Sequence, residues 1–454
     1  MYQVQDSVAL LRARRGFAAA RKTGRPFVAR TVLLLGLTSL LTDISSEMVS
    51  AVLPLYMVQV LGLNPLQIGV LNGIQQGGSA FARLIFGFVA DRMSRYREVA
   101  GIGYGLSAIC KLGLLATTAF GPLMAVLLID RTGKGIRTAP RDAMISLSTP
   151  QDELGTAFGV HRAMDTCGAM LGPLLGFALL ALTPHEYHGI FLVSFCFALI
   201  GVAILLLLVD DPARDPERVA AAKAAEVEAE AAAVAAAPAA PAPTEADEPA
   251  GGRLTLRGAA GLLSGGPLGG LVLISFLLGL ATIGDALLYL QLHERLDFAD
   301  SLFPLLYVGT SSIFMVMAVP AGRLSDRIGR AKVFTFGYAI LLALYIVLLS
   351  GASSDLLIPA TLLGLGIFYA STDGVLAALG SAAVPEAVRG TGLATLGTAA
   401  ALAQFGASIA FGALWKVAGA HTAFIVFTAG LATALAATVL VLLILPRRRA
   451  MGAA

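Results

Sequence analysis

Twelve long apolar stretches constrain this chain more than any other feature of its sequence. Each is long enough to cross the hydrocarbon core of a bilayer, which takes about 20 residues of helix. Turn formers such as Pro65, Gly121 and Pro184 lie in the short links between them. The stretches are 31–60, 66–89, 98–119, 122–146, 156–182, 190–209, 267–292, 302–322, 332–350, 356–383, 391–417 and 422–445. The sequence therefore predicts an all-α membrane protein with twelve transmembrane helices.

The charge content agrees with this prediction. Only 13% of the 454 residues are charged, whereas soluble domains carry about 25%. A chain with so little polar surface cannot be an ordinary cytosolic enzyme, a disordered protein or a secreted disulfide scaffold. The three cysteines lie inside apolar stretches without the spacing of a metal site.

The distribution of basic residues predicts the orientation in the membrane. Residues 1–30 contain seven Lys and Arg against one acid. Further basic clusters follow the second and eighth stretches and form the tail, whereas the opposite links are nearly free of them, with Arg295 as the exception. Cytoplasmic segments carry such an excess. We expect a multi-pass protein of the inner or plasma membrane with both termini in the cytoplasm, and an N-terminal arm that is not a cleaved signal peptide.

An Ala/Glu/Pro-rich segment divides the chain into two halves. It has no apolar period that could anchor a core and is expected to be a cytoplasmic tether or a segment that docks a partner. The predicted organisation is a basic arm (1–30), a six-helix bundle (31–209), the linker (210–266), a second six-helix bundle (267–445) and a basic tail (446–454).

The two halves repeat the same landmarks. The segment GFVADRMSR at 87–95 recurs as GRLSDRIGR at 322–330, which is 235 residues later. Pro150 and Pro385 have the same offset, and so do the Gly-Thr pairs that begin at Gly155 and Gly390. Two homologous bundles in parallel orientation place a cavity between them near the middle of the bilayer. This arrangement suits alternating access rather than a continuous pore.

Three motifs resemble signatures of the major facilitator superfamily. GFVADRMSR is similar to G-x-x-x-D-R-x-x-R, and residues 131–135 are similar to R-x-x-Q-G with Lys134 in place of Gln. Residues 168–176 resemble G-x-x-x-G-P-x-x-G, which is typical of antiporter branches, although Phe177 replaces a second closing Gly. The resemblance implies the twelve-helix fold of that superfamily and a transport function, but hardly constrains the substrate.

The motif residues suggest two mechanical roles. Acids at helix ends can pair with arginines in one global state and release them in the other. This predicts a conformational latch, with topogenic charge as the alternative; its residues are Gly87, Asp91, Arg92, Arg95, Gly322, Asp326, Arg327 and Arg330. Small residues four apart allow close helix packing or a bending seam; these are Gly168, Gly172, Pro173 and Gly176.

Ionisable residues inside the apolar stretches are the candidates for the functional site, because charges in a membrane usually face a cavity or one another. The candidates are Asp43, Glu47, Arg131, Lys134, His161, Arg162, Asp165, Asp285 and Asp373. We expect an acid among Asp43, Glu47 and Asp165 to carry a proton and Arg131 to exchange partners. The alternative is a permanent ion-paired network. Arg137 and Arg141 lie closer to the cytoplasmic mouth and are weaker candidates.

These observations predict a secondary transporter, with proton-coupled efflux of a small molecule as the first hypothesis. Uptake of a small, possibly anionic, nutrient is the alternative, and a receptor or enzyme on the same scaffold is a distant third. The segment RTGKGIRT lacks the glycine and hydroxyl positions of a phosphate-binding loop. We expect no cofactor, no metal and no nucleic-acid partner, and a monomer whose partners are the substrate, protons or another coupling ion, and the bilayer.

Overall fold

The computed structural model describes residues 28–93, 95–149, 153–211, 267–350, 356–383 and 389–444. Within these ranges the regular structure is helical, and no strand occurs. The first half comprises α2 (Arg30–Leu55) with the π-helical turn η1 (Tyr56–Val60), α3 (Pro65–Met93), α4 (Tyr96–Leu115), α5 (Phe120–Leu147), α6 (Leu154–Leu182) and α7 (Tyr187–Leu208). The second half comprises α10 (Pro267–Leu280), α11 (Asp285–Leu296), η3 (Asp300–Leu302), α12 (Phe303–Ile328), α13 (Arg330–Leu349), α14 (Leu357–Ala382), α15 (Arg389–Ala418), α16 (Ala420–Val439) and η5 (Leu440–Ile444).

The prediction of twelve spanning helices is confirmed. Ten helical segments of the described chain are long and apolar enough to cross a membrane. The other two spans are α3 and α5, whose polar and charged residues lower their hydropathy. These two helices, as shown below, supply much of the functional site.

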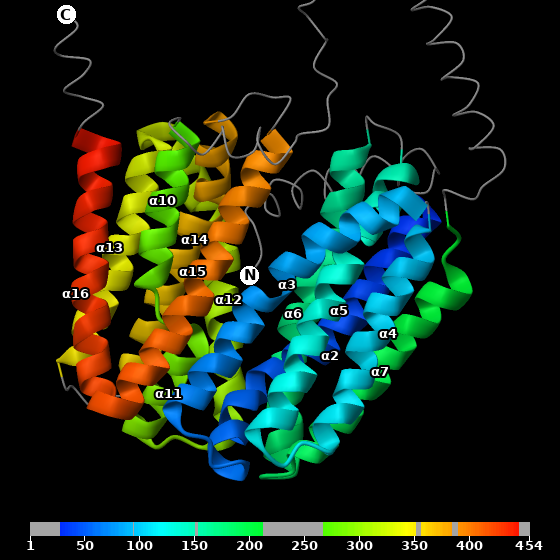
Figure 1. The fold of residues 1–454 in the computed structure, drawn as a ribbon, viewed down its shortest axis with the longest axis horizontal. Coiled ribbons are helices and arrows are strands. Elements are labelled where there is room, and N and C mark those ends of the chain that lie inside the picture. The colour runs from blue at the N-terminus through cyan, green and yellow to red at the C-terminus, as the bar shows by residue number, and fades with distance from the viewer. Residues whose placement is uncertain are drawn as a thin grey trace, which may run out of the picture.

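The helices form two bundles that stand side by side (Figure 1). The helix ends at Arg30, Leu208, Pro267 and Ile444 lie at one end of the molecule, here named the terminal end. The short links α2–α3, α6–α7, α11–α12 and α15–α16 lie at the opposite end, here named the link end.

At the link end the two bundles are in close contact through α3 and α15. A Cβ atom built on Gly69 would lie 3.1 Å from the Cα of Gly412, so the two backbones touch. One turn further, Asn72 Nδ2 donates a hydrogen bond of 3.0 Å to Ser408 Oγ, and both side chains are buried. Glycine allows this approach because it has no side chain to separate the helices.

A contact between a carboxyl group and an imidazole also crosses between the bundles at the link end. Asp300, in η3, lies 3.6 Å from His185 Nδ1 in the α6–α7 link and 3.1 Å from His293 Nε2 in α11. His185 belongs to the N-terminal bundle and is exposed, whereas the other two belong to the C-terminal bundle. Asp300 is therefore positioned to tie the two bundles together at this end.

The seventh span is interrupted, which the sequence prediction of one helix over 267–292 missed. The chain leaves helical geometry after Leu280 and resumes it at Asp285. The backbone N–H of Ile283 is freed by the break and donates to the hydroxyl of Tyr345 at 2.7 Å. A Cβ on Gly284 would collide with the amide of Asn72, so the break lies directly against α3. Irregular backbone persists inside a membrane only where such partners replace the helical hydrogen bonds.

The glycines of α6 pack against α2. A Cβ on Gly168 would lie 3.0 Å from Leu40 Cα, and one on Gly172 would lie 3.0 Å from Glu47 Cβ. Gly176 has ordinary van der Waals space. The first two glycines thus set the α2–α6 distance, while a bending role for this motif stays a prediction. The arm to residue 27, the linker from 212 to 266, the tail from 445 and the side chains of Gly87, Asp91 and Arg92 lie outside the described residues.

Candidate functional site

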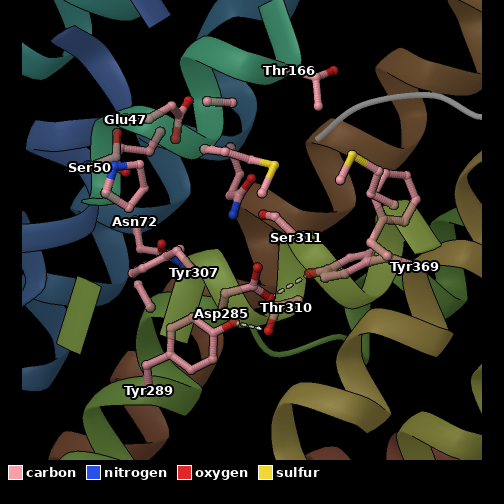
Figure 2. Close-up of a pocket in the computed structure, with 18 of the residues that line it drawn as sticks. Glu47, Ser50, Asn72, Thr166, Asp285, Tyr289, Tyr307, Thr310, Ser311 and Tyr369 are labelled. Carbon is pink, nitrogen blue, oxygen red and sulfur yellow. Dashed lines mark hydrogen bonds between the residues drawn. The ribbon is translucent and has the colours of Figure 1, made fainter. Parts of the chain in front are cut away.

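A polar cavity of about 340 Å³ lies between the two bundles (Figure 2). Its N-terminal wall contributes charges and amides, including Glu47, Asn72, Gln75, Gln76, Arg131 and Lys134. Its C-terminal wall contributes one acid and four aromatic side chains, among smaller and hydroxyl-bearing residues; the acid and the aromatics are Asp285, Tyr289, Tyr307, Phe314 and Tyr369. The cavity therefore brings together four of the residues predicted from the sequence, which are Glu47, Arg131, Lys134 and Asp285.

Asp285 owes its place in the cavity to the break in the seventh span. It is the first residue of α11, immediately after the unwound residues 281–284. The hydroxyl of Tyr369 donates a hydrogen bond to Asp285 Oδ1. Nearby, the hydroxyls of Tyr289 and Thr310 are 2.7 Å apart. Figure 2 shows both pairs and places Glu47 and Ser50 on the other side of the cavity.

Asp373 was predicted to line the cavity together with Asp285, but it is not among the lining residues. Its Oδ2 atom is buried without a hydrogen-bond partner in the described part of the chain. Both acids belong to the C-terminal bundle, and only the one at the helix break reaches the cavity.

A buried ion triad stands behind the N-terminal wall. Asp130 lies 2.9 Å from Lys111 Nζ and 2.6 Å from Arg131 Nη2. All three side chains are less than 10% exposed. Arg131 was expected to pair with a proton-carrying acid, but in this state its partner is Asp130. The triad holds the Arg131 side chain in the cavity wall, because moving it would leave buried charges uncompensated.

A second buried cluster joins α2, α5 and α6 around two carboxyl groups. The side chains of Asp43 in α2 and Asp165 in α6 lie close enough to interact with each other. Arg137 Nη2 lies 3.5 Å from Asp43, and Arg141 Nη1 lies 3.8 Å from Asp165. Arg162, half exposed, lies 3.6 Å from Asp165. Two neighbouring carboxyl groups can share a proton, which relieves the repulsion between their charges.

Ser39 connects this acid pair to neighbouring polar groups. Its hydroxyl is 3.1 Å from His161 Nε2 and 3.2 Å from the hydroxyl of Tyr104, and it accepts a hydrogen bond of 3.2 Å from Arg141 Nη1. The guanidinium of Arg137 lies 4.5 Å above the Tyr104 ring. The predicted candidate His161 is fully buried in this network rather than in the cavity.

The sequence reasoning undervalued Arg137, Arg141 and Asp130. The two arginines were placed near the cytoplasmic mouth by counting residues along α5, yet they are the cationic partners of the acid pair. The available signal was the stripe Asp130, Lys134, Arg137 and Arg141, whose helical spacing puts them on related faces of α5.

The repeated motif after α12 makes contacts inside its own bundle. Arg330 Nη1 donates to the carbonyl of Ala378 at 3.1 Å, and Arg330 Nη2 lies 3.8 Å from Asp326. These contacts tie the start of α13 to α14 and to the end of α12, while in the first repeat Arg95 is exposed. A latch that changes between states remains a prediction.

The sequence profile of the Major Facilitator Superfamily matches residues 35–408 and 271–453. The chain belongs to this superfamily. An uncharacterised MFS-type transporter of Methanocaldococcus jannaschii is 30% identical over 398 residues, which cover 86% of this chain and 89% of the relative. The resemblance stated from the three signature motifs is thereby confirmed, as is the transporter fold.

Solved structures of the superfamily share the fold at low sequence identity. The nucleoside transporter NupG has a TM-score of 0.69 and 17% identity, with 90% of this chain and 98% of that chain covered. A D-xylose–proton symporter has a TM-score of 0.65 and 16% identity, with coverage of 91% and 96%. The arrangement fits secondary transport of a small molecule across a membrane in which the chain is embedded.

Proposed function

We propose that this protein exports a small molecule across the inner or plasma membrane in exchange for protons, by alternating access. The observation that carries the proposal is the position of the acid pair relative to the cavity. Lys134 lines the cavity, and Arg137, less than one helical turn further along α5, faces Asp43. A single helix thus connects the site that would hold the solute with the site that would hold the proton.

The coupling follows from the charges of the second cluster. When Asp43 and Asp165 share a proton, the pair is held together. When that proton leaves, the two carboxylates repel each other and attract Arg137 and Arg141 more strongly. The resulting movement of α2 and α6 against α5 would change the cavity wall, because all three helices contribute lining residues.

The packing between the bundles supports alternating access. The cavity is bounded toward the link end by the glycine contact of α3 with α15 and by the hydrogen bond between Asn72 and Ser408. With the basic segments in the cytoplasm, as the distribution of charges favours, the structure corresponds to a state closed toward the outside. Export as the direction rests on the antiporter-like motif of α6, and the protein would work as a monomer without a cofactor.

Spin-label distances test this proposal without knowledge of the substrate. In a background that lacks Cys110, Cys167 and Cys196, one labelled pair replaces Val60 and Val417 at the link end. A second pair replaces Leu147 and Ile328 at the terminal end; all four positions are exposed. We expect a change from mildly alkaline to mildly acidic pH to lengthen one distance and shorten the other.

The acid pair should be required for this response. Asp43→Asn and Asp165→Asn are each expected to remove the pH dependence of both distances, whereas Asp210→Asn, at an exposed site beyond α7, keeps it. Proton coupling at this pair would be refuted if the two distances in the native protein did not change with pH. It would also be refuted if both variants kept the pH response.

A further inference from the structure

The N-terminal wall of the cavity presents a cation that has no ion-pair partner in the described part of the chain. Lys134 and Arg131 both line the cavity. Arg131 is paired with Asp130, which it shares with Lys111, whereas Lys134 has no acidic atom within 4 Å among the described residues. Asp43, behind the wall, and Glu47, in the wall itself, act on this charge only at longer range. An ammonium group in a site surrounded by lipid gains most from an anion that comes close.

The opposite wall presents an acid, Asp285, that can bind a cationic group. Asp285 accepts a hydrogen bond from Tyr369, and no cation of the described chain lies within 4 Å of it. Tyr289 and Tyr307, in the same wall, stand edge to face with ring centroids 4.8 Å apart. Aromatic faces beside a carboxylate favour a cationic group such as an ammonium.

We propose that the transported substrate is a small zwitterion that spans the two bundles. Its carboxylate or other anionic group lies against Lys134, and its ammonium group lies against Asp285 beside Tyr307. This inference rests on the proposed transport function and adds the chemical class of the substrate. A singly charged solute would leave either Lys134 or Asp285 without compensation. The cavity volume of about 340 Å³ suits a small solute, since ligand pockets measure roughly 300–1,000 Å³.

Binding of such a substrate should also change the equilibrium between conformations. Lys134 belongs to α5 of one bundle and Asp285 to α11 of the other. A molecule held at both ends attracts the two walls toward each other and favours the state in which they are closest. A solute held by one wall alone gives no such preference.

The test uses one set of probes that vary charge on a fixed skeleton. The zwitterions glycine, β-alanine, γ-aminobutyrate, ε-aminocaproate and alanylphenylalanine cover a range of distances between the two charges. Each is compared with its N-acetyl derivative, its methyl ester and the doubly blocked form. The readout is the midpoint of thermal unfolding of the purified full chain, because a compound that binds the folded state raises it.

We expect at least one zwitterion to raise the midpoint and to bind about tenfold more tightly than either singly blocked form, each of which loses one charge contact. The doubly blocked form, which loses both contacts, should bind more weakly still. A preference for a singly charged or neutral form overturns the proposal. So does a zwitterion series without any stabilisation. These comparisons use the native sequence and do not depend on a variant that folds.

Two substitutions locate the groups. Lys134→Gln should make the zwitterion and its methyl ester bind equally, and Asp285→Asn should make the zwitterion and its N-acetyl form bind equally. Lys416→Gln and Asp210→Asn, at exposed positions outside the cavity, should retain the native preference. The assigned positions would be contradicted if both cavity variants lost the binding of all probes equally, while their unfolding midpoints without any probe stayed at the native value.

This result is independent of the spin-label test. If the protein binds zwitterions selectively but the spin-label distances do not change with pH, the zwitterion site is supported and proton-coupled export is refuted. A normal pH response without any zwitterion binding would do the reverse.

Discussion

A methyl group at Gly412 should drive the two bundles apart at the link end. In the structure, a Cβ on Gly412 would lie 3.0 Å from the Cα of Gly69 and 3.2 Å from the Cα of Leu66. These atoms belong to the backbone of α3 and cannot rotate away. Overpacking of this kind costs about 1–3 kcal/mol. We expect the cost to apply only to the state closed at the link end, because α3 and α15 separate in the other state.

A cost of that size changes the equilibrium between the two states by roughly 5–150-fold. The assay is the spin-label distance between positions 60 and 417 in the Gly412→Ala variant. The population with the longer distance should grow at least about fivefold relative to the population with the shorter distance. The matched control is Gly397→Ala on the same helix, where a Cβ meets no atom within 4 Å. Both variants gain the same helix propensity, so this gain cancels in the comparison.

The reasoning fails if Gly412→Ala and Gly397→Ala give the same distance distribution. Thermal unfolding of both proteins provides the necessary check of folding. A lower midpoint with an unchanged distribution would mean that the α3–α15 contact stabilises the fold as a whole and does not separate two states.

Two further substitutions probe the charged contacts. Asp130→Asn should lower the free energy of unfolding by about 3–5 kcal/mol, because it leaves Lys111 and Arg131 buried without a counter-charge; thermal unfolding measures this, and an unchanged midpoint would show that the triad contributes nothing. Asp300→Asn removes the contact with the exposed His185, so it should shift the link-end distance distribution less than Gly412→Ala does, by a free energy of roughly 0–1 kcal/mol. A larger shift than that of Gly412→Ala would assign the main closure to the contact between Asp300 and His185.

The twelve spans and the duplication could be predicted because both are encoded locally. A run of about 20 apolar residues must cross the bilayer regardless of its neighbours. The offset of 235 residues between GFVADRMSR and GRLSDRIGR is a property of the chain alone. The candidate acids and bases could also be selected, since an ionisable residue inside an apolar span is conspicuous in any sequence. Glu47, Lys134 and Asp285 were found in this way.

The partners of these residues could not be predicted, because pairing depends on how each helix is rotated about its axis. Counting residues along α5 gave the depth of Arg137 but not the fact that it faces Asp43. Nor did it indicate that Arg131 turns to its neighbour Asp130. The break before Asp285 had no clear signal in an apolar run, since Tyr345, which satisfies the freed backbone group, lies 62 residues away.

The sequence by itself determined that this chain is a duplicated membrane bundle with ionisable groups concentrated in its first half. Hydropathy and repeats are properties of neighbouring residues, and they survive without coordinates. Only the tertiary structure decided which charges line the cavity and which are paired behind its wall. That distinction depends on contacts between helices far apart in sequence, such as Asn72 with Ser408, and no local pattern specifies them.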